Sequence, residues 1–242
     1  MTILTKSDQY KAVDDLIEEG RADRNYWMLL ILSSVIIASG ILLANSAILI
    51  GGMLVTPVLT PILLIALGIV TSKSRLISHT AILIGKSIMV IFIVSLVMGF
   101  LFDVPKESEF FDSVIFNNSL NAAALYFLVA FASGIAATFS WVRKELSNMV
   151  SGISIAVSLV PPISMVAVWI STGHLDNARF FMLIFLFNMI GVVVGSMIVF
   201  SMFQFYRVAP KVEKKVEEVI HEEERIKIAI EKKKNGNGKG VK

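Results

Sequence analysis

The sequence predicts an all-α membrane protein whose chain crosses the bilayer six times. Hydrophobic residues make up 55% of the 242 residues and charged residues only 17%, whereas soluble domains contain about 25% charged residues. Most of the charges lie before residue 27 or after residue 206, so the middle of the chain carries too few to cover a water-exposed surface. A soluble fold is excluded, and bulk disorder is excluded because it requires low hydrophobicity.

Six apolar stretches account for the expected membrane domain, residues 27–206. Each approaches or exceeds the ~20 residues that a helix needs to cross ~30 Å of hydrocarbon, and none contains Asp or Glu. They lack the alternation of barrel strands, which favours helices. The expected spans are Trp27–Ala44, Ala47–Val70, Ile77–Phe102, Asn121–Trp141, Asn148–Ile170 and Phe180–Tyr206.

The distribution of basic residues predicts the orientation of these spans. With a cytoplasmic N-terminus, only Lys106 and Arg179 among the Lys and Arg residues outside the spans would face the other side, in accord with the positive-inside rule. A re-entrant second stretch would instead place Lys73 and Arg75 outside. We therefore expect a multi-pass protein of the plasma (inner) membrane with both termini in the cytoplasm.

The chain can be divided into two groups of three spans. With a shift of 101 residues, Gly51 aligns with Gly152 and Pro61 with Pro162, each pair lying in the middle spans of the two groups. Because three is odd, the second group would be inverted relative to the first. In inverted-repeat transporters, paired Gly/Pro-interrupted segments point to the binding site. The match is weak, and two such helices in corresponding places can also arise by chance.

Prolines are expected to break both middle spans, because proline removes a backbone donor and clashes with the preceding turn. Thr60 and Pro61 fit an N-cap and the first residue of a new half-helix. The exposed N–H groups of such a half-helix suit an anion or a polar molecule. The alternative is that the prolines only kink helices whose neighbours fill the gap. The candidate solute-binding residues are Thr56, Pro57, Thr60, Pro61, Lys86, Ser158, Pro161 and Pro162.

Lys86 is the charged residue that lies well inside a predicted span. An intramembrane Lys costs about 2.5–3.5 kcal/mol on insertion scales and is a functional candidate by default. The alternative is that the long third span is tilted and the side chain snorkels to the headgroups. The sequence leaves both interpretations open.

Polar segments flank the membrane domain. In residues 1–26 a short amphipathic helix is expected from a cap at Ser7 to Glu19, with Tyr10 and Val13 on its apolar face. In residues 207–242 a charged helix is expected to open at Pro210 and to give way to a disordered tail from Asn235. Its apolar residues follow a 4-3 spacing that fits a short coiled coil or a solvated helix; they are Val212, Val216, Val219, Ile226 and Ile230.

Residues 25–70 carry a family resemblance. The segment contains Asn25-Tyr26-Trp27, a run from Ser33 to Ser46, and Ile50-Gly51-Gly52-Met53-Leu54 followed by Pro57 and Pro61. It resembles the prokaryotic "uncharacterised hydrophobic domain" family of integral membrane proteins of unknown function. The resemblance implies a shared membrane fold and no established activity. Many members of that family carry a larger soluble domain before the membrane part, where this chain has about 26 residues.

The first functional hypothesis is a transporter or channel for a small polar or anionic solute. The alternative is a structural or regulatory membrane protein that forms a homo-oligomer through the Gly191–Gly195 face and the C-terminal helix. An enzyme is not expected, because the three His residues are scattered and neither catalytic nor metal-ligating spacing occurs within the spans. The expected partners are the lipid bilayer and a solute, without nucleic acid, cofactor or metal.

Overall fold

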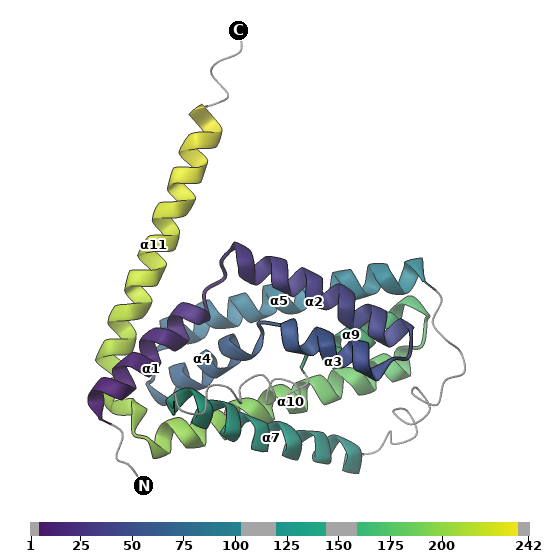
Figure 1. Ribbon diagram of the computed structural model, residues 1–242, viewed down its shortest axis with the longest axis horizontal. Coiled ribbons are helices and arrows are strands. Elements are labelled where there is room, and N and C mark those ends of the chain that lie inside the picture. Colours follow the sequence, from purple (N-terminus) through teal and green to yellow (C-terminus); the bar gives the residue numbers. More distant parts are fainter. Residues whose placement is uncertain (1–4, 103–119, 144–158, 237–242) are drawn as a thin grey trace.

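The computed structural model describes residues 5–102, 120–143 and 159–236, and within these ranges the regular structure is entirely helical (Figure 1). The all-α prediction is therefore confirmed. The helices are α1 (Lys6–Glu19), α2 (Arg24–Leu42), α3 (Ser46–Val55), α4 (Leu59–Val70), α5 (Ser74–Leu101), α7 (Leu120–Val142), α9 (Val160–Ser171), α10 (Leu175–Met202), the 3₁₀ helix η2 (Phe205–Val208) and α11 (Ala209–Gly236).

Helices α2 to α10 form a bundle, and α1 and α11 lie at one end of it (Figure 1). Among the described residues, four helical segments are long and apolar enough to cross a membrane: α2, α5, α10 and residues 124–142 of α7. Helices α3 and α4 add a fifth if the bent pair is counted as one span. Helix α9 is a shorter apolar helix, and the first half of the predicted fifth span lies outside the described residues.

Large apolar side chains cover the outward faces of these helices. A soluble monomer rarely exposes an apolar patch of more than a few hundred Å², and the exposed residues here extend along every long helix of the bundle. Apolar helices of this length with apolar outward faces suggest a membrane protein. The outward residues include Met28 and Leu32 of α2, Ile82, Met89, Ile93 and Phe100 of α5, Leu125 and Val129 of α7, and Leu186, Ile190 and Ile198 of α10.

Two pairs of helices have equal lengths and are offset by 101 residues. Helices α4 and α9 contain 12 residues each, and α5 and α10 contain 28 each. Adding 101 to the bounds of α4 and α5 gives the bounds of α9 and α10. The same offset aligns Pro61 with Pro162.

The turns that end α4 and α9 repeat the same hydrogen bonds. Each contains one left-handed residue, Ser72 (φ 55°) or Gly173 (φ 81°). N–H groups after each helix donate back to carbonyls of its last turn, as in a Schellman motif. The corresponding bonds are Thr71 N to Leu67 O and Thr172 N to Val168 O, Ser72 N to Ile69 O and Gly173 N to Ile170 O, and Lys73 N to Gly68 O and His174 N to Trp169 O.

The short helices pack across the two halves of the chain. Helix α9 contacts α5 as well as α10, and α4 contacts α10 as well as α5. Helices α5 and α10 run in opposite directions along the bundle (Figure 1). Nearly all of α9 is buried, including every residue from Val160 to Trp169, so this helix lies in the core.

Glycines allow α7 and α10 to touch backbone to backbone. A β-carbon at Gly195 would lie 2.2 Å from the Phe131 carbonyl oxygen, and one at Gly134 would lie 2.4 Å from the Val192 carbonyl oxygen. A β-carbon at Gly191 would also meet backbone of α7, at 2.8 Å. The Gly191–Gly195 motif therefore makes a close helix contact within the chain, and α7 occupies the face named in the oligomerisation hypothesis.

The sixth predicted span ends earlier than expected. Helix α10 stops at Met202 and the chain reverses at Gln204, whose φ is 57°. Helix η2 follows, and α11 then opens at Ala209 with Pro210 in its first turn. Helix α11 continues through Asn235 to Gly236, so the predicted start of the disordered tail at Asn235 is too early in the sequence. Residues 237–242 lie outside the described part.

The N-terminal helix differs from its prediction at the cap. Thr5, not Ser7, is the N-cap, because the Thr5 hydroxyl accepts from the Asp8 N–H while the Asp8 carboxylate accepts from the Thr5 N–H at 3.0 Å. This reciprocal arrangement is a capping box. Val13, Leu16 and Ile17 are buried as expected, whereas Tyr10 is 42% exposed.

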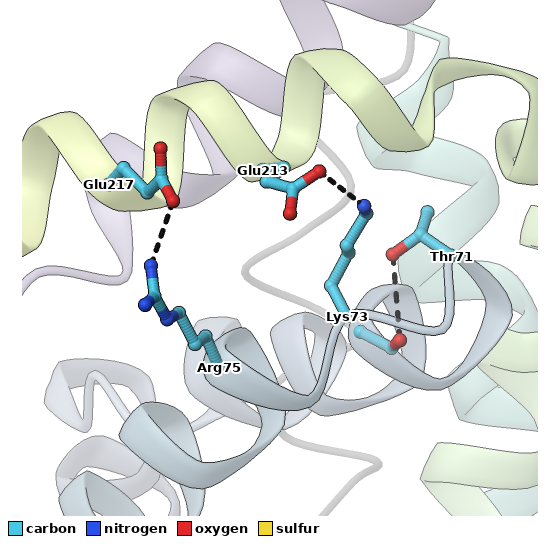
Figure 2. A network of polar contacts seen from close by, with 6 residues as sticks. Thr71, Lys73, Arg75, Glu213 and Glu217 are labelled. Carbon is cyan, nitrogen blue, oxygen red and sulfur yellow. Dashed lines mark hydrogen bonds and ion pairs between the residues drawn. The ribbon is translucent and has the colours of Figure 1, made fainter.

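Ion pairs hold α11 against α1 and against the turn between α4 and α5, and Figure 2 shows the pairs at that turn. Lys73 Nζ lies 2.6 Å from Glu213 Oε2, and Arg75 Nη1 lies 2.7 Å from Glu217 Oε1. On the α1 side, Lys211 pairs with Asp14 at 2.8 Å, Lys215 with Glu18 at 3.9 Å, and Glu222 with Arg21, just beyond α1, at 2.9 Å. We call these five pairs the clamp. Val212, Val216 and Val219 are buried beneath it.

Candidate functional site

The first break is a bend of 53° between α3 and α4. Thr56 ends α3 in an extended conformation (ψ 123°), which is the conformation that a following proline imposes. The Thr56 hydroxyl donates to the Gly52 carbonyl at 3.0 Å. Pro57 therefore causes the break, and the threonine before it satisfies one carbonyl of the ending helix.

The predicted cap at Thr60 and Pro61 is wrong. Helix α4 begins at Leu59, and its N-cap is Val58, which makes no side-chain capping bond. Pro61 is the third residue of α4. A proline is tolerated in the first turn because the N–H groups of that turn have no carbonyl partner inside the helix. Pro61 is buried and Thr60 is half-buried.

The second candidate break precedes α9. Helix α9 opens at Val160 with Leu159 as N-cap, again without a side-chain capping bond, and with Pro161 and Pro162 in its first turn. Leu159 has φ −84° and ψ −33°, close to the −80° and −21° of Val58 in the other half. Ser158 lies outside the described residues, so its proposed role beside the prolines is not tested.

Both half-helices begin away from the ends of the bundle. In Figure 1, α4 and α9 extend from its middle in opposite directions, and α3, which leads into the first break, contacts α9. A helix N-terminus carries partial positive charge from its aligned peptide dipoles. The arrangement thus brings two uncapped, proline-bearing N-termini into the interior of the bundle.

Lys86 lies apart from these breaks. It is exposed on α5 and shares a helical face with Ile82, Met89 and Ile93, which are 50–63% exposed. The opposite face of α5 is the buried one and carries Ser87. The structure therefore does not bring the Lys86 ammonium into the interior with Pro57, Pro61, Pro161 and Pro162.

Buried polar groups on α5 and α10 occupy corresponding positions. Ser87 and Asn188 lie at the midpoints of the two 28-residue helices and are 101 residues apart, as are Ser95 and Ser196 further along. All four are buried. Sequence reasoning did not single out Ser87, Ser95 or Ser196, and a comparison of polar residues at the 101-residue offset would have found them.

The hydrogen bonds of these groups differ between the halves. The Ser87 hydroxyl lies 2.7 Å from the Tyr26 hydroxyl and also donates to the Leu83 carbonyl at 2.9 Å. The Ser196 hydroxyl donates across to the Gly134 carbonyl of α7 at 3.3 Å. The hydroxyls of Ser95 and of Ser164 in α9 are buried and make no hydrogen bond within the described part of the chain. Buried hydroxyls without partners are uncommon, so each of these two is free to make a hydrogen bond with an additional polar group.

The described interior has hydroxyl and amide groups but no acidic cluster. Among residues 5–102, 120–143 and 159–236, no group of three His, Asp or Glu side chains is placed to hold a metal ion.

Comparisons with known proteins point to one family. A family model described as a domain of unknown function (DUF389) matches residues 53–194, a range that contains the break between α3 and α4 and the start of α9. An uncharacterised protein of Methanocaldococcus jannaschii is 23% identical over 198 residues. The matched part covers 82% of this chain and 59% of that protein, so the chain spans less than two thirds of the relative's length. No solved structure matches the chain.

Proposed function

The chain belongs to the family with the domain of unknown function DUF389, and we propose that it passes a small polar or anionic solute across the membrane. The supporting observation is the pair of short helices, α4 and α9, which carry prolines in their first turns inside the bundle, have equal lengths and equivalent terminal turns, and are offset by 101 residues. Broken helices at corresponding places in two repeats are the feature that points to a transporter binding site.

The proposed architecture is six spans in two inverted repeats. In this proposal, α2, the α3–α4 pair and α5 form the first repeat, and α7, a span that ends in α9, and α10 form the second. The opposite directions of α5 and α10 (Figure 1) and the reciprocal packing of α9 on α5 and of α4 on α10 support the inversion. The basic residues favour a cytoplasmic position for both termini, in the plasma membrane.

The proposed solute site lies where the two half-helices begin. Hydroxyl groups would come from Thr56, Thr60 and Ser158. The backbone hydrogen bonds there would be interrupted by the prolines, which are Pro57, Pro61, Pro161 and Pro162. The positive ends of α4 and α9 favour an anion or the negative end of a polar molecule. Lys86 has no part in this site, since its outward position supports the snorkelling interpretation. Passage of the solute involves no chemical step, so the proposal does not require an enzyme.

No specific observation favours the oligomerisation alternative. Its proposed glycine face is filled by α7, and the first half of its proposed helical interface, α11, is held by the chain's own α1 and α4–α5 turn.

A flux assay in proteoliposomes tests the proposal. The purified full chain is reconstituted, and the uptake of small anions and neutral polar solutes is compared with that of protein-free vesicles. A solute that enters only in the presence of protein supports the proposal, and the absence of flux across the whole panel would contradict it.

One matched pair of variants tests the location of the site. Thr60→Val removes a hydroxyl at the start of α4 without a change of volume, and we expect it to lower the flux of the transported solute severalfold. Thr172→Val removes a hydroxyl at the far end of α9, where it bonds to α9's own carbonyls at 3.1 and 3.4 Å and to the neighbouring His174 ring at 3.1 Å. This control should retain wild-type flux.

A further inference from the structure

Helix α11 extends beyond the bundle. The clamp and the buried Val212, Val216 and Val219 fix its first half across the end of the bundle. In Figure 1 the helices of the bundle run horizontally, whereas α11 rises across them, and its far half passes the edge of the bundle. We call residues 223–236, which follow the last residue of the clamp, the overhang.

The apolar stripe of α11 continues into the overhang. Val212, Val216 and Val219 follow a 4-3 spacing, and the same face of the helix returns at Ile226 and Ile230 after an interruption at Glu223. Ile226 is 49% exposed, in contrast to Val212, which is fully buried. The stripe therefore has a partner in the first half of the helix and none within the described chain at Ile226.

The overhang is also basic. It contains five basic and three acidic residues; Glu223 and Glu224 stand at its start, and from Arg225 to Gly236 the one acidic residue is Glu231. Lys227, Lys232, Lys233 and Lys234 lie close to Ile226 and Ile230 in the sequence. A helix with an apolar stripe flanked by lysines has the signature of one that lies in the interface of an anionic bilayer.

The orientation of α11 agrees with that signature. Helices of membrane-crossing length run along the bundle axis, so the bilayer normal follows this axis. A helix that crosses this axis at the end of the bundle runs along the membrane surface, and beyond the edge of the bundle that surface consists of lipid headgroups. We infer that the overhang of α11 binds the surface of an anionic lipid bilayer, with Ile226 in the interface and the net positive charge of the segment attracted to the anionic headgroups.

This inference requires the bundle to be embedded in a membrane but is independent of solute passage. The competing partner for the stripe is a second copy of the chain, which would pair overhang with overhang as a coiled coil. Binding to lipid depends on the charge of the headgroups, whereas pairing of copies depends on protein density.

The natural absence of cysteine allows a single reporter to be placed on the overhang. In Ile226→Cys, an environment-sensitive dye is attached to the full chain, which is reconstituted in phosphatidylcholine vesicles with or without phosphatidylglycerol. We expect a blue-shifted emission and quenching by nitroxide-labelled lipid only when phosphatidylglycerol is present. Molar salt should abolish both signals, because it shortens the Debye length to ~3 Å.

Two variants control the assay. His221→Cys places the dye on the exposed face opposite the stripe, where the emission should not respond to headgroup charge. The triple substitution Lys232→Glu, Lys233→Glu and Lys234→Glu in Ile226→Cys should abolish the response and leave the bundle's unfolding temperature unchanged. Equal signals in the two lipids, or a signal that follows protein density regardless of lipid charge, would overturn the proposal.

Discussion

At the scale of single residues, glycine decides how closely α7 and α10 approach. Gly195→Ala would place a β-carbon 2.2 Å from the Phe131 carbonyl oxygen, so the backbones must separate. Overpacking of this kind costs about 1–3 kcal/mol, and we expect a clearly lower unfolding temperature in detergent.

A matched control for Gly195→Ala lies on the outer surface of α5. A β-carbon at Gly85 would meet no atom within 4 Å. Alanine is favoured over glycine by about 0.5–1 kcal/mol inside a helix, so Gly85→Ala should be neutral or stabilising. Equal effects of the two substitutions would contradict the close α7–α10 contact.

Lys86 provides a second prediction at this scale. The exposed position on an apolar face and the tilt of helical side chains toward the N-terminus direct the ammonium toward the end of α5 that carries Arg75. Lys86→Met should therefore leave solute flux at the wild-type level and should not lower stability. Loss of flux in a folded Lys86→Met protein would contradict this prediction and would show that solute passage needs Lys86.

At the scale of elements, the turn after α4 has a residue poorly suited to its conformation. Ser72 adopts φ 55°, whereas the corresponding residue after α9 is a glycine, Gly173. The left-handed conformation costs roughly 1–2 kcal/mol for an L-residue, so Ser72→Gly should stabilise the protein by about 1 kcal/mol. Gly173→Ala should destabilise it by a similar amount, as measured by thermal unfolding; a loss of stability in Ser72→Gly would contradict the assigned turn.

The sequence predicts the elements better than it predicts their ends. The apolar stretches correctly locate α2, α5, α7 and α10, because long helices leave a strong compositional signal. The break in the second stretch is also correctly expected, but its position is wrong. Pro57 and Pro61 both disfavour a continuous helix, and only the structure shows that Pro61 can be accommodated in the first turn of α4.

The candidate site is predicted in part, because sequence shows spacing but not the direction of side chains. Pro57 lies at the observed break between α3 and α4, and Pro61, Pro161 and Pro162 lie in the first turns of α4 and α9. Lys86 points outward, and its position on α5 relative to the buried face depends on which neighbours pack there. Ser87 and Ser95 are isolated hydroxyls in the sequence, and the equal helix lengths, which repeat the 101-residue offset, draw attention to their correspondence with Asn188 and Ser196.

At the scale of the whole molecule, the clamp makes the position of α11 sensitive to acid and salt. The hydrogen bond and the positive charge of Lys73 lower the pKa of the Glu213 carboxyl below its ordinary value of 4.5. Since the pKa is lowered in the folded state, this pair contributes stability above about pH 4.5 and loses it as the pH falls through the lowered value. We expect acidification, or molar salt, to release α11 from the α4–α5 turn.

A distance measured by electron paramagnetic resonance detects this release. Nitroxides at Ser78→Cys on α5 and Glu218→Cys on α11, both exposed positions, should give one narrow distance at neutral pH and a broad distribution at pH 3. Glu213→Gln should broaden the distribution already at neutral pH. An unchanged narrow distance at pH 3 and in molar salt would show that apolar packing alone holds α11.

The account depends most on the inverted relation between the two halves, and labelling at Ser74 and Leu175 tests it directly. These exposed residues begin α5 and α10 and are 101 residues apart. In sealed vesicles with the protein in one orientation, Ser74→Cys and Leu175→Cys should react with a membrane-impermeant thiol reagent from opposite sides. Ser74→Cys should react from the same side as a cysteine placed at Ser7. Reaction of Ser74→Cys and Leu175→Cys from the same side would contradict the inverted repeat and the solute path built on it.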